Sequence, residues 1–167
     1  APVVISGCTV RNYTNRFVYV SLSGKIESLT IDDCIFIGAD NSTTNKAIYA
    51  SSAHTQVETL SVTNSTFLNF NTGSNYFFRI NCGEELVLMP VVLIDHCTFY
   101  NCYDRRGVYL YNAGRSTIKN CISAFSERRD DTKSFTAYGD ESIVKNVISY
   151  NVDLYGSAPK ENIISKN

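Results

Sequence analysis

The chain has 167 residues, and its 15 basic and 16 acidic residues give a net charge of −1. This length suits one domain with its own core, and the balanced charge gives no reason to expect nucleic acid or an anionic membrane as a partner. Eleven Tyr, nine Phe and many Val, Ile and Thr residues favour strands, and no stretch approaches the ~20 apolar residues of a membrane span.

A short motif recurs six times and predicts pairs of strands. Each copy alternates apolar and polar residues, has a bend-forming residue at its fifth position and continues into a second short strand. In chain order, the copies are residues 3–10, 29–36, 60–67, 92–99, 116–123 and 142–149. A helical repeat would show a 3.6-residue period, which these copies lack. A degraded seventh copy is expected to begin at Ile163.

The fifth position of each copy carries a residue type that tolerates a positive φ angle. These residues are Gly7, Asp33, Asn64, His96, Asn120 and Asn146. A left-handed residue turns the chain without a loop, so the next side chain points inward. That inward position holds Cys8, Cys34, Ser65, Cys97, Cys121 and Val147. Because free cysteine packs as a small apolar residue, we expect a ladder of buried thiols, with a redox or metal role as the alternative. His96 is interpreted as a turn residue.

The two remaining cysteines, Cys82 and Cys102, lie outside this ladder. No cysteine forms a C-x-x-C pair, so a metal cluster is not expected. Cys82 and Cys102 are the one pair for which we consider a disulfide bond.

A third strand follows a variable loop in every complete repeat. These strands are residues 17–21, 47–51, 77–81, 107–111 and 135–138. A left-handed β-helix keeps a stricter hexapeptide register, so the loose period favours the right-handed form. The sequence therefore predicts an all-β, right-handed parallel β-helix of about six coils, with three parallel sheets, no substantial helix and a single domain over residues 1–167.

Alternation along the third strands places columns of side chains on the outer face of their sheet. The first column is Tyr19, Tyr49, Arg79, Tyr109 and Thr136, and the next is Ser21, Ser51, Asn81, Tyr111 and Tyr138. With coils about 4.8 Å apart, the rings and the guanidinium would line an extended ligand. Aromatic faces with an arginine suit a sugar chain that carries carboxylates. The alternative is that the tyrosines only stack on one another for stability.

The recurrent Val/Ile-x-Asn-Cys-x-Phe pattern, as in residues 94–99 and 118–121, resembles the pectate-lyase-like right-handed β-helix proteins, including the chondroitinase-B and alginate-lyase type. The resemblance covers nearly the whole chain and implies the fold. Its members include lyases, hydrolases, tailspikes, adhesins and stalks. It implies a polysaccharide partner, no membrane insertion, and a secreted, periplasmic or cell-surface location. Family enzymes have more coils and a capping helix, so we expect a longer parent protein whose further coils or neighbouring domain cover an end.

A polysaccharide lyase neutralises a uronate carboxylate, removes a proton with a base and protonates the leaving oxygen. Arg79 is the candidate for neutralisation, and Lys133 is the candidate base. The predicted substrate contacts are Tyr19, Tyr49, Arg79, Asn81, Arg105, Arg106, Tyr109 and Tyr111. No cofactor or metal site is evident in the sequence. Binding of Ca²⁺ is expected only if the protein is a calcium-dependent lyase. Two functions stay open: an acidic-polysaccharide lyase, and a non-catalytic glycan-binding or structural segment of a cell-surface protein.

Overall fold

The computed structural model describes residues 1–20, 25–39, 45–52, 56–71, 76–82, 90–111 and 113–166, and the side chains of all of these except 51, 52, 56, 81 and 82. Every element in these ranges is a strand. The strands are β1 (Pro2–Ser6), β2 (Thr9–Val10), β3 (Arg16–Val20), β4 (Lys25–Asp32), β5 (Ile35–Ile37), β6 (Lys46–Ser52), β7 (Gln56–Thr63), β8 (Thr66–Leu68), β9 (Phe78–Cys82), β10 (Val91–Asp95), β11 (Thr98–Tyr100), β12 (Val108–Leu110), β13 (Arg115–Ala124), β14 (Lys133–Ala137), β15 (Ile143–Tyr150), β16 (Asp153–Tyr155) and β17 (Lys160–Lys166). In these ranges there is no helix of the length and apolarity needed to cross a membrane.

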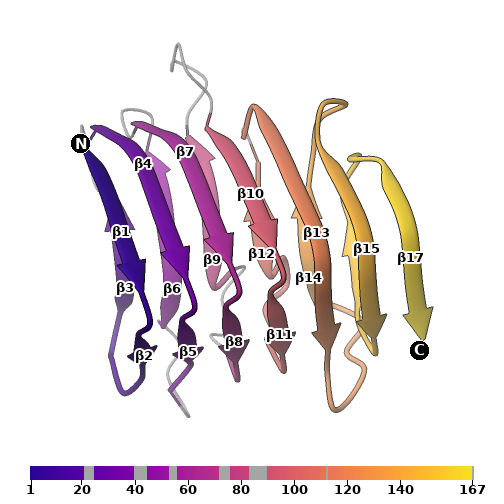
Figure 1. Cartoon of the computed structure of the whole chain (residues 1–167). Coiled ribbons are helices and arrows are strands. Elements are labelled where there is room, and N and C mark those ends of the chain that lie inside the picture. The colour runs from indigo at the N-terminus through magenta and orange to yellow at the C-terminus, as the bar shows by residue number, and fades with distance from the viewer. Residues whose placement is uncertain are drawn as a thin grey trace.

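Parallel pairing between successive repeats builds a solenoid (Figure 1). The first run of strands is β1-β4-β7-β10-β13-β15-β17, and the second is β2-β5-β8-β11, which also joins β13. The third is a separate six-stranded sheet in the order β3-β6-β9-β12-β14-β16, seen behind the first in Figure 1. The predicted parallel β-helix is therefore confirmed. Of the three predicted sheets, two are joined, because β13 pairs with both β10 and β11.

The predicted alignment of the repeat is confirmed residue by residue. The third positions of the copies pair as Ile5–Ile31, Ile31–Val62, Val62–Ile94, Ile94–Ile118 and Ile118–Val144. The expected start of the seventh copy is wrong, because Ile163 pairs with Val147 and thus occupies the inward position after the bend. The first strand of that copy could not be recognised because Lys160 stands at the third position, where the other copies have Ile or Val.

All six predicted bend residues have left-handed backbones. Their φ angles are 65° at Gly7, 52° at Asp33, 50° at Asn64, 53° at His96, 53° at Asn120 and 52° at Asn146. Cys34, Cys97 and Cys121 are buried as expected, whereas Cys8, on the strand pair that has a neighbour on one side only, is exposed. The buried thiols donate to backbone carbonyls; the Sγ of Cys97 lies 3.4 Å from the oxygen of Asp95 and 3.5 Å from that of Val62.

A second set of left-handed asparagines, which was not predicted from the sequence, follows β2, β8, β11 and β15. Asn12, Asn69, Asn101 and Asn151 have φ angles of 58°, 56°, 51° and 56°. Cys102 follows Asn101 and is a buried free thiol, with its Sγ 3.5 Å from the carbonyl oxygen of Phe67. Cys102 thus fills the inward position of a second bend. The disulfide considered for it is absent, and the side chain of Cys82 lies outside the described residues.

Stacked phenylalanines fill the interior behind the short strands. Phe36, Phe67 and Phe99 pair in register on β5, β8 and β11. Successive ring centroids are 5.0 Å apart, with the planes within 6° of parallel. Phe135 of the third sheet meets Phe99 edge-on at 5.0 Å. This aromatic stack packs the second run of strands against the six-stranded sheet. The opposite side of that sheet is therefore its outer face.

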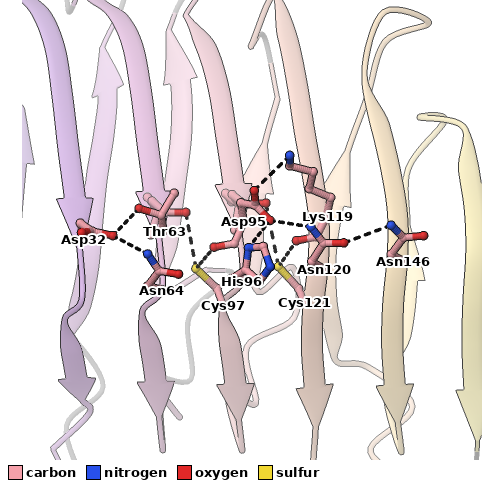
Figure 2. Close-up of polar contacts among 12 residues, drawn as sticks. Asp32, Thr63, Asn64, Asp95, His96, Cys97, Lys119, Asn120, Cys121 and Asn146 are labelled. Carbon is pink, nitrogen blue, oxygen red and sulfur yellow. Dashed lines mark hydrogen bonds and ion pairs between the residues drawn. The ribbon is translucent and has the colours of Figure 1, made fainter.

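Outside the first bend, polar side chains form a ladder along the solenoid (Figure 2). Asn146 donates to Asn120, and Asn120 donates to Asp95, at 3.0 and 2.8 Å. His96 and Lys119 also contact the Asp95 carboxylate, at 2.8 and 3.0 Å. Although partial burial opposes it, the Asn120 amide and the Lys119 ammonium lower the pKa of Asp95. The interpretation of His96 as a turn residue is confirmed, because its backbone is left-handed and its side chain belongs to this ladder.

Candidate functional site

The predicted outward column lies in register on the six-stranded sheet. Tyr19 pairs with Tyr49, Tyr49 with Arg79, and Arg79 with Tyr109. Thr136 continues the row next to Tyr109. The inward neighbours of this column, such as Ile48, are buried, so strand alternation turns the column away from the core.

Side chains that flank the column complete a larger surface, which we call the tyrosine–arginine face. Its members are Arg16, Tyr19, Tyr49, Tyr76, Arg79, Arg106, Tyr109, Tyr111 and Tyr138. The rings follow one another with centroid separations of 5.8 Å for Tyr19–Tyr49, 6.0 Å for Tyr49–Tyr76, 5.7 Å for Tyr76–Tyr109, 5.8 Å for Tyr109–Tyr111 and 5.3 Å for Tyr111–Tyr138. All of these lie within the ~4.5–7 Å range of aromatic pairs. One continuous aromatic strip therefore crosses five strands of the sheet.

Three arginines of this face stack on its tyrosine rings. The Cζ of Arg16 lies 4.4 Å from the centroids of both Tyr19 and Tyr49. The Cζ of Arg79 lies 4.5 Å from the Tyr76 ring, and its Nη1 donates to the hydroxyls of Tyr49 and Tyr76. The Cζ of Arg106 lies 4.8 Å from the Tyr109 ring.

No carboxylate neutralises these three arginines within the part of the chain that the structure describes. Elsewhere, by contrast, Arg128 and Lys133 both contact Asp153, at 3.1 and 3.4 Å. The tyrosine–arginine face thus holds its guanidinium groups by cation–π contacts and leaves their charge available to an anion.

Exposure differs along the face. Tyr19 is 50 % exposed and Tyr111 is 39 % exposed, whereas Tyr109 is only 6 % exposed. Tyr109 points outward as predicted but is covered by Tyr76, Tyr111 and the Arg106 guanidinium. In the middle of the face, Tyr109 therefore packs against its neighbours, and the more exposed rings, such as those of Tyr19 and Tyr111, are the ones that solvent can reach.

Three residues at this surface, Arg16, Lys46 and Tyr76, were not predicted from the sequence. Lys46 is nearly buried, its Nζ donates to the carbonyl oxygen of Tyr76 at 3.2 Å, and burial lowers its pKa against the attraction of Asp104. Arg16 pairs with Lys46 in the sheet. A signal existed, because Arg16, Lys46 and Tyr76 are 30 residues apart, the same spacing as Tyr19, Tyr49 and Arg79.

The two predicted catalytic residues do not come together. Arg79 lies on β9 and Lys133 on β14, with β12 between them, which separates the strands by roughly 9–10 Å. The Nζ of Lys133 lies 3.4 Å from Oδ2 of Asp153. Asn81 pairs with Ser51 through the backbone, and its side chain is outside the described residues.

Lys133 instead lies at the same pocket as the other two predicted cations, Arg105 and Arg106. Together they line a pocket of about 370 Å³. Its other lining residues are Asp130, Asp131, Thr136, Tyr138 and Tyr155. Arg105 and Arg106 precede β12 and Lys133 is the first residue of β14, and the structure brings all three to the lining of one cavity.

Carboxylates in this region do not form a calcium site. Across the described ranges, no group of three or more His, Cys, Asp or Glu side chains is arranged to hold a metal ion. Asp153 is occupied by Arg128 and Lys133, and the tyrosine–arginine face carries no carboxylate of its own. Among the described residues, therefore, no carboxylate cluster of the kind that Ca²⁺ prefers lies at this face.

The fold and this face define a parallel β-helix protein with an aromatic, cationic sheet surface. Residues 1–70 match the family model described as Domain of unknown function (DUF4957). No curated protein matches the chain, and no solved structure does. The match assigns no activity, so a functional interpretation depends on the chemistry of the face.

Proposed function

We propose that the tyrosine–arginine face binds an extended acidic polysaccharide. The observation that carries this proposal is the row of three arginines that stack on tyrosine rings without a carboxylate partner among the described residues. Guanidinium groups held in this way can pair with carboxylate or sulfate groups, and exposed tyrosine rings can pack against the apolar faces of sugar rings. A secreted, periplasmic or cell-surface location and a longer parent solenoid belong to the same proposal.

The regular spacing of the face favours a polymer over a small molecule. The register of Tyr19, Tyr49, Arg79 and Tyr109 places one side chain on each successive strand, at intervals of about 4.8 Å. Charge and ring contacts are thus repeated along a line. A repeating anionic chain can use several of these contacts at once, which raises its affinity above that of a single contact.

Binding without cleavage is the activity that the geometry favours for this chain. Lys133, the predicted base, is held by Asp153. A base acting in elimination must be close to both the substrate and the cation that neutralises its carboxylate, whereas Lys133 and Arg79 lie two strands apart.

A lyase remains the second candidate because of Lys46. The Tyr76 ring has the Cζ of Arg79 4.5 Å from its centroid and the Nζ of Lys46 5.3 Å from it. Burial lowers the pKa of Lys46 and so favours its neutral amine, the form that can accept a proton as a base. Incubation with pectate, alginate and chondroitin sulfate tests this candidate, because β-elimination produces absorbance at about 232 nm. Absence of any rise, with and without calcium, would eliminate the lyase candidate.

The binding proposal is tested by gel electrophoresis with and without pectate, alginate or chondroitin sulfate in the gel. We expect at least one of these polymers to retard the unmodified chain, and added salt to reduce the effect. Arg79→Gln and Tyr49→Ala should both weaken the retardation. Arg115→Gln removes the same charge from β13, on the other sheet, and should leave it unchanged. No retardation by any acidic polymer, or equal retardation of all four proteins, would overturn the proposal.

A further inference from the structure

The pocket lined by Arg105, Arg106 and Lys133 lies at one end of the tyrosine–arginine face. Tyr138 belongs to both, because it lines the pocket and its ring meets that of Tyr111 edge-on at 5.3 Å. The pocket volume of about 370 Å³ is near the lower end of the ~300–1,000 Å³ typical of ligand sites. The aromatic strip thus leads into a cavity whose size suits a small group rather than a polymer.

The wall that carries the two arginines is held tightly against β14. Thr136 donates from Oγ1 to the carbonyl oxygen of Arg106 at 3.0 Å, and the amide of Gly107 donates to the carbonyl of Asp104 at 3.2 Å. Gly107 has a φ of 57°, and a Cβ at this position would lie 2.3 Å from the carbonyl oxygen of Lys133. Only glycine therefore allows the loop to approach the strand this closely, so the wall is formed before any ligand arrives.

Charge inside the pocket is not balanced by its own residues. The carboxylate of Asp153 forms ion pairs with both Lys133 and Arg128. Oδ1 of Asp130 lies 3.7 Å from Nε of Arg128. Within the described residues, Arg105 and Arg106 form no ion pair, and the remaining carboxylate of the lining is that of Asp131. Two guanidinium groups without a carboxylate partner thus line the same pocket, and each offers the planar donor geometry that suits an anion.

The other groups of the pocket match the rest of a sugar. Tyr155 is 55 % exposed and offers a ring for the apolar face of a pyranose. Asp131 is exposed, and its carboxylate can accept hydrogen bonds from hydroxyl groups. A purely inorganic anion would leave both the ring and the carboxylate without a role.

We propose that this pocket binds one anionic sugar residue, with its carboxylate or sulfate group on Arg105 and Arg106 and its ring on Tyr155. The inference rests on the proposed function in one respect, since the bound residue would be the end of the polysaccharide that lies along the tyrosine–arginine face. The pocket would then set the direction in which the polymer binds.

Titration of the whole chain with monosaccharides, followed by NMR chemical shifts, tests the pocket separately from the strip. The probes are galacturonate, galactose 6-sulfate and neutral galactose at low salt. We expect at least one anionic sugar to bind roughly tenfold or more tightly than galactose, because charge-assisted hydrogen bonds add to the affinity. Arg105→Gln should remove this preference, whereas Arg115→Gln, with the same loss of charge, should keep it. Arg105 is exposed and forms no ion pair with any residue that the structure describes, so its replacement should leave the fold intact.

Each outcome has a defined meaning. Preference for galacturonate identifies a carboxylate ligand, preference for the sulfate identifies a sulfated one, and either supports the pocket. Binding of neither anion, equal binding of galactose, or an unchanged preference in Arg105→Gln would overturn it. If acidic polymers still retard the chain when the monosaccharides fail, the pocket inference alone falls. If a monosaccharide binds while no polymer retards the chain, the pocket stands and the proposed function of the face falls.

Discussion

Asn120 donates a hydrogen bond from its Nδ2 to Oδ1 of Asp95, 2.8 Å away, across the paired strands β13 and β10. The same amide accepts a hydrogen bond from Asn146 through its Oδ1. Its backbone is left-handed, with a φ of 53°. One residue therefore turns the chain, continues the corner ladder and helps to hold a carboxylate in its ionised form.

Replacement of Asn120 should separate its backbone role from its side-chain role. Asn120→Ala loses the hydrogen bonds and adopts an unfavourable φ, so we expect the free energy of unfolding to fall by roughly 2–4 kcal/mol. Asn120→Gly loses the same hydrogen bonds but tolerates the φ, so it should be about 1 kcal/mol more stable than the alanine variant. Urea titration measures both values. Equal stability of the two variants would show that the left-handed backbone contributes nothing here.

The corner ladder should make stability depend on pH in the acidic range. The pKa of Asp95 is lowered in the folded chain, so its contribution is complete above the ordinary aspartate pKa of about 3.9 and is lost as the pH falls through the lower folded value. Urea titrations from neutral to acidic pH should show stability falling with pH, and less steeply in Asp95→Asn. Asp140→Asn, at an exposed turn position, is the control and should keep the slope of the unmodified chain. An unchanged slope in Asp95→Asn would contradict the prediction.

Cysteine reactivity should report which thiols lie inside the solenoid. Burial raises the pKa of Cys102, and the neighbouring thiol of Cys97 together with burial raises that of Cys121. Iodoacetamide requires an accessible thiolate, so Cys8 should be alkylated quickly, and Cys102 and Cys121 only after unfolding. Peptide mass spectrometry resolves each site. Rapid labelling of Cys121 in the folded chain would show that the ladder position is open to solvent.

Two glycines with similar backbone angles should respond differently to alanine. Gly7 and Gly107 have φ angles of 65° and 57°, but a Cβ on Gly7 meets nothing within 4 Å, whereas one on Gly107 would strike the carbonyl oxygens of Lys133 and Ser134. We expect Gly7→Ala to cost about 1–2 kcal/mol from the φ alone, and Gly107→Ala to cost more. Thermal unfolding followed by circular dichroism provides the comparison. A Gly107→Ala variant as stable as Gly7→Ala would mean that the loop is not held against β14.

Much of the fold follows from local chemistry that repeats along the chain. The residue types at Asp33, Asn64 and Asn120 predict a left-handed bend without knowledge of any tertiary contact. Strand alternation then predicts which side chains point inward and which point outward. The second bend was missed because its sequence signal is weaker: Cys102 follows Asn101, but the equivalent position after Asn69 holds Phe70. Because no small residue recurs there, the inward position after this second bend could not be recognised from the sequence.

The register of the tyrosine–arginine face could be predicted because Tyr19, Tyr49 and Arg79 repeat every 30 residues. The side-chain contacts of this face could not be predicted in the same way. Stacking of Arg16 on two rings and the burial of Tyr109 depend on how side chains from different coils pack together.

The solenoid, its register and the column of outward tyrosines could all be predicted from the sequence, because they depend on the period of the repeat and on backbone preferences at single positions. The ion pair of Lys133 with Asp153, and the pocket that Arg105 and Arg106 line, became visible only in the folded chain. These relationships join loops of unequal length from different coils. No periodicity encodes such contacts, since they depend on where each loop folds back onto the sheet.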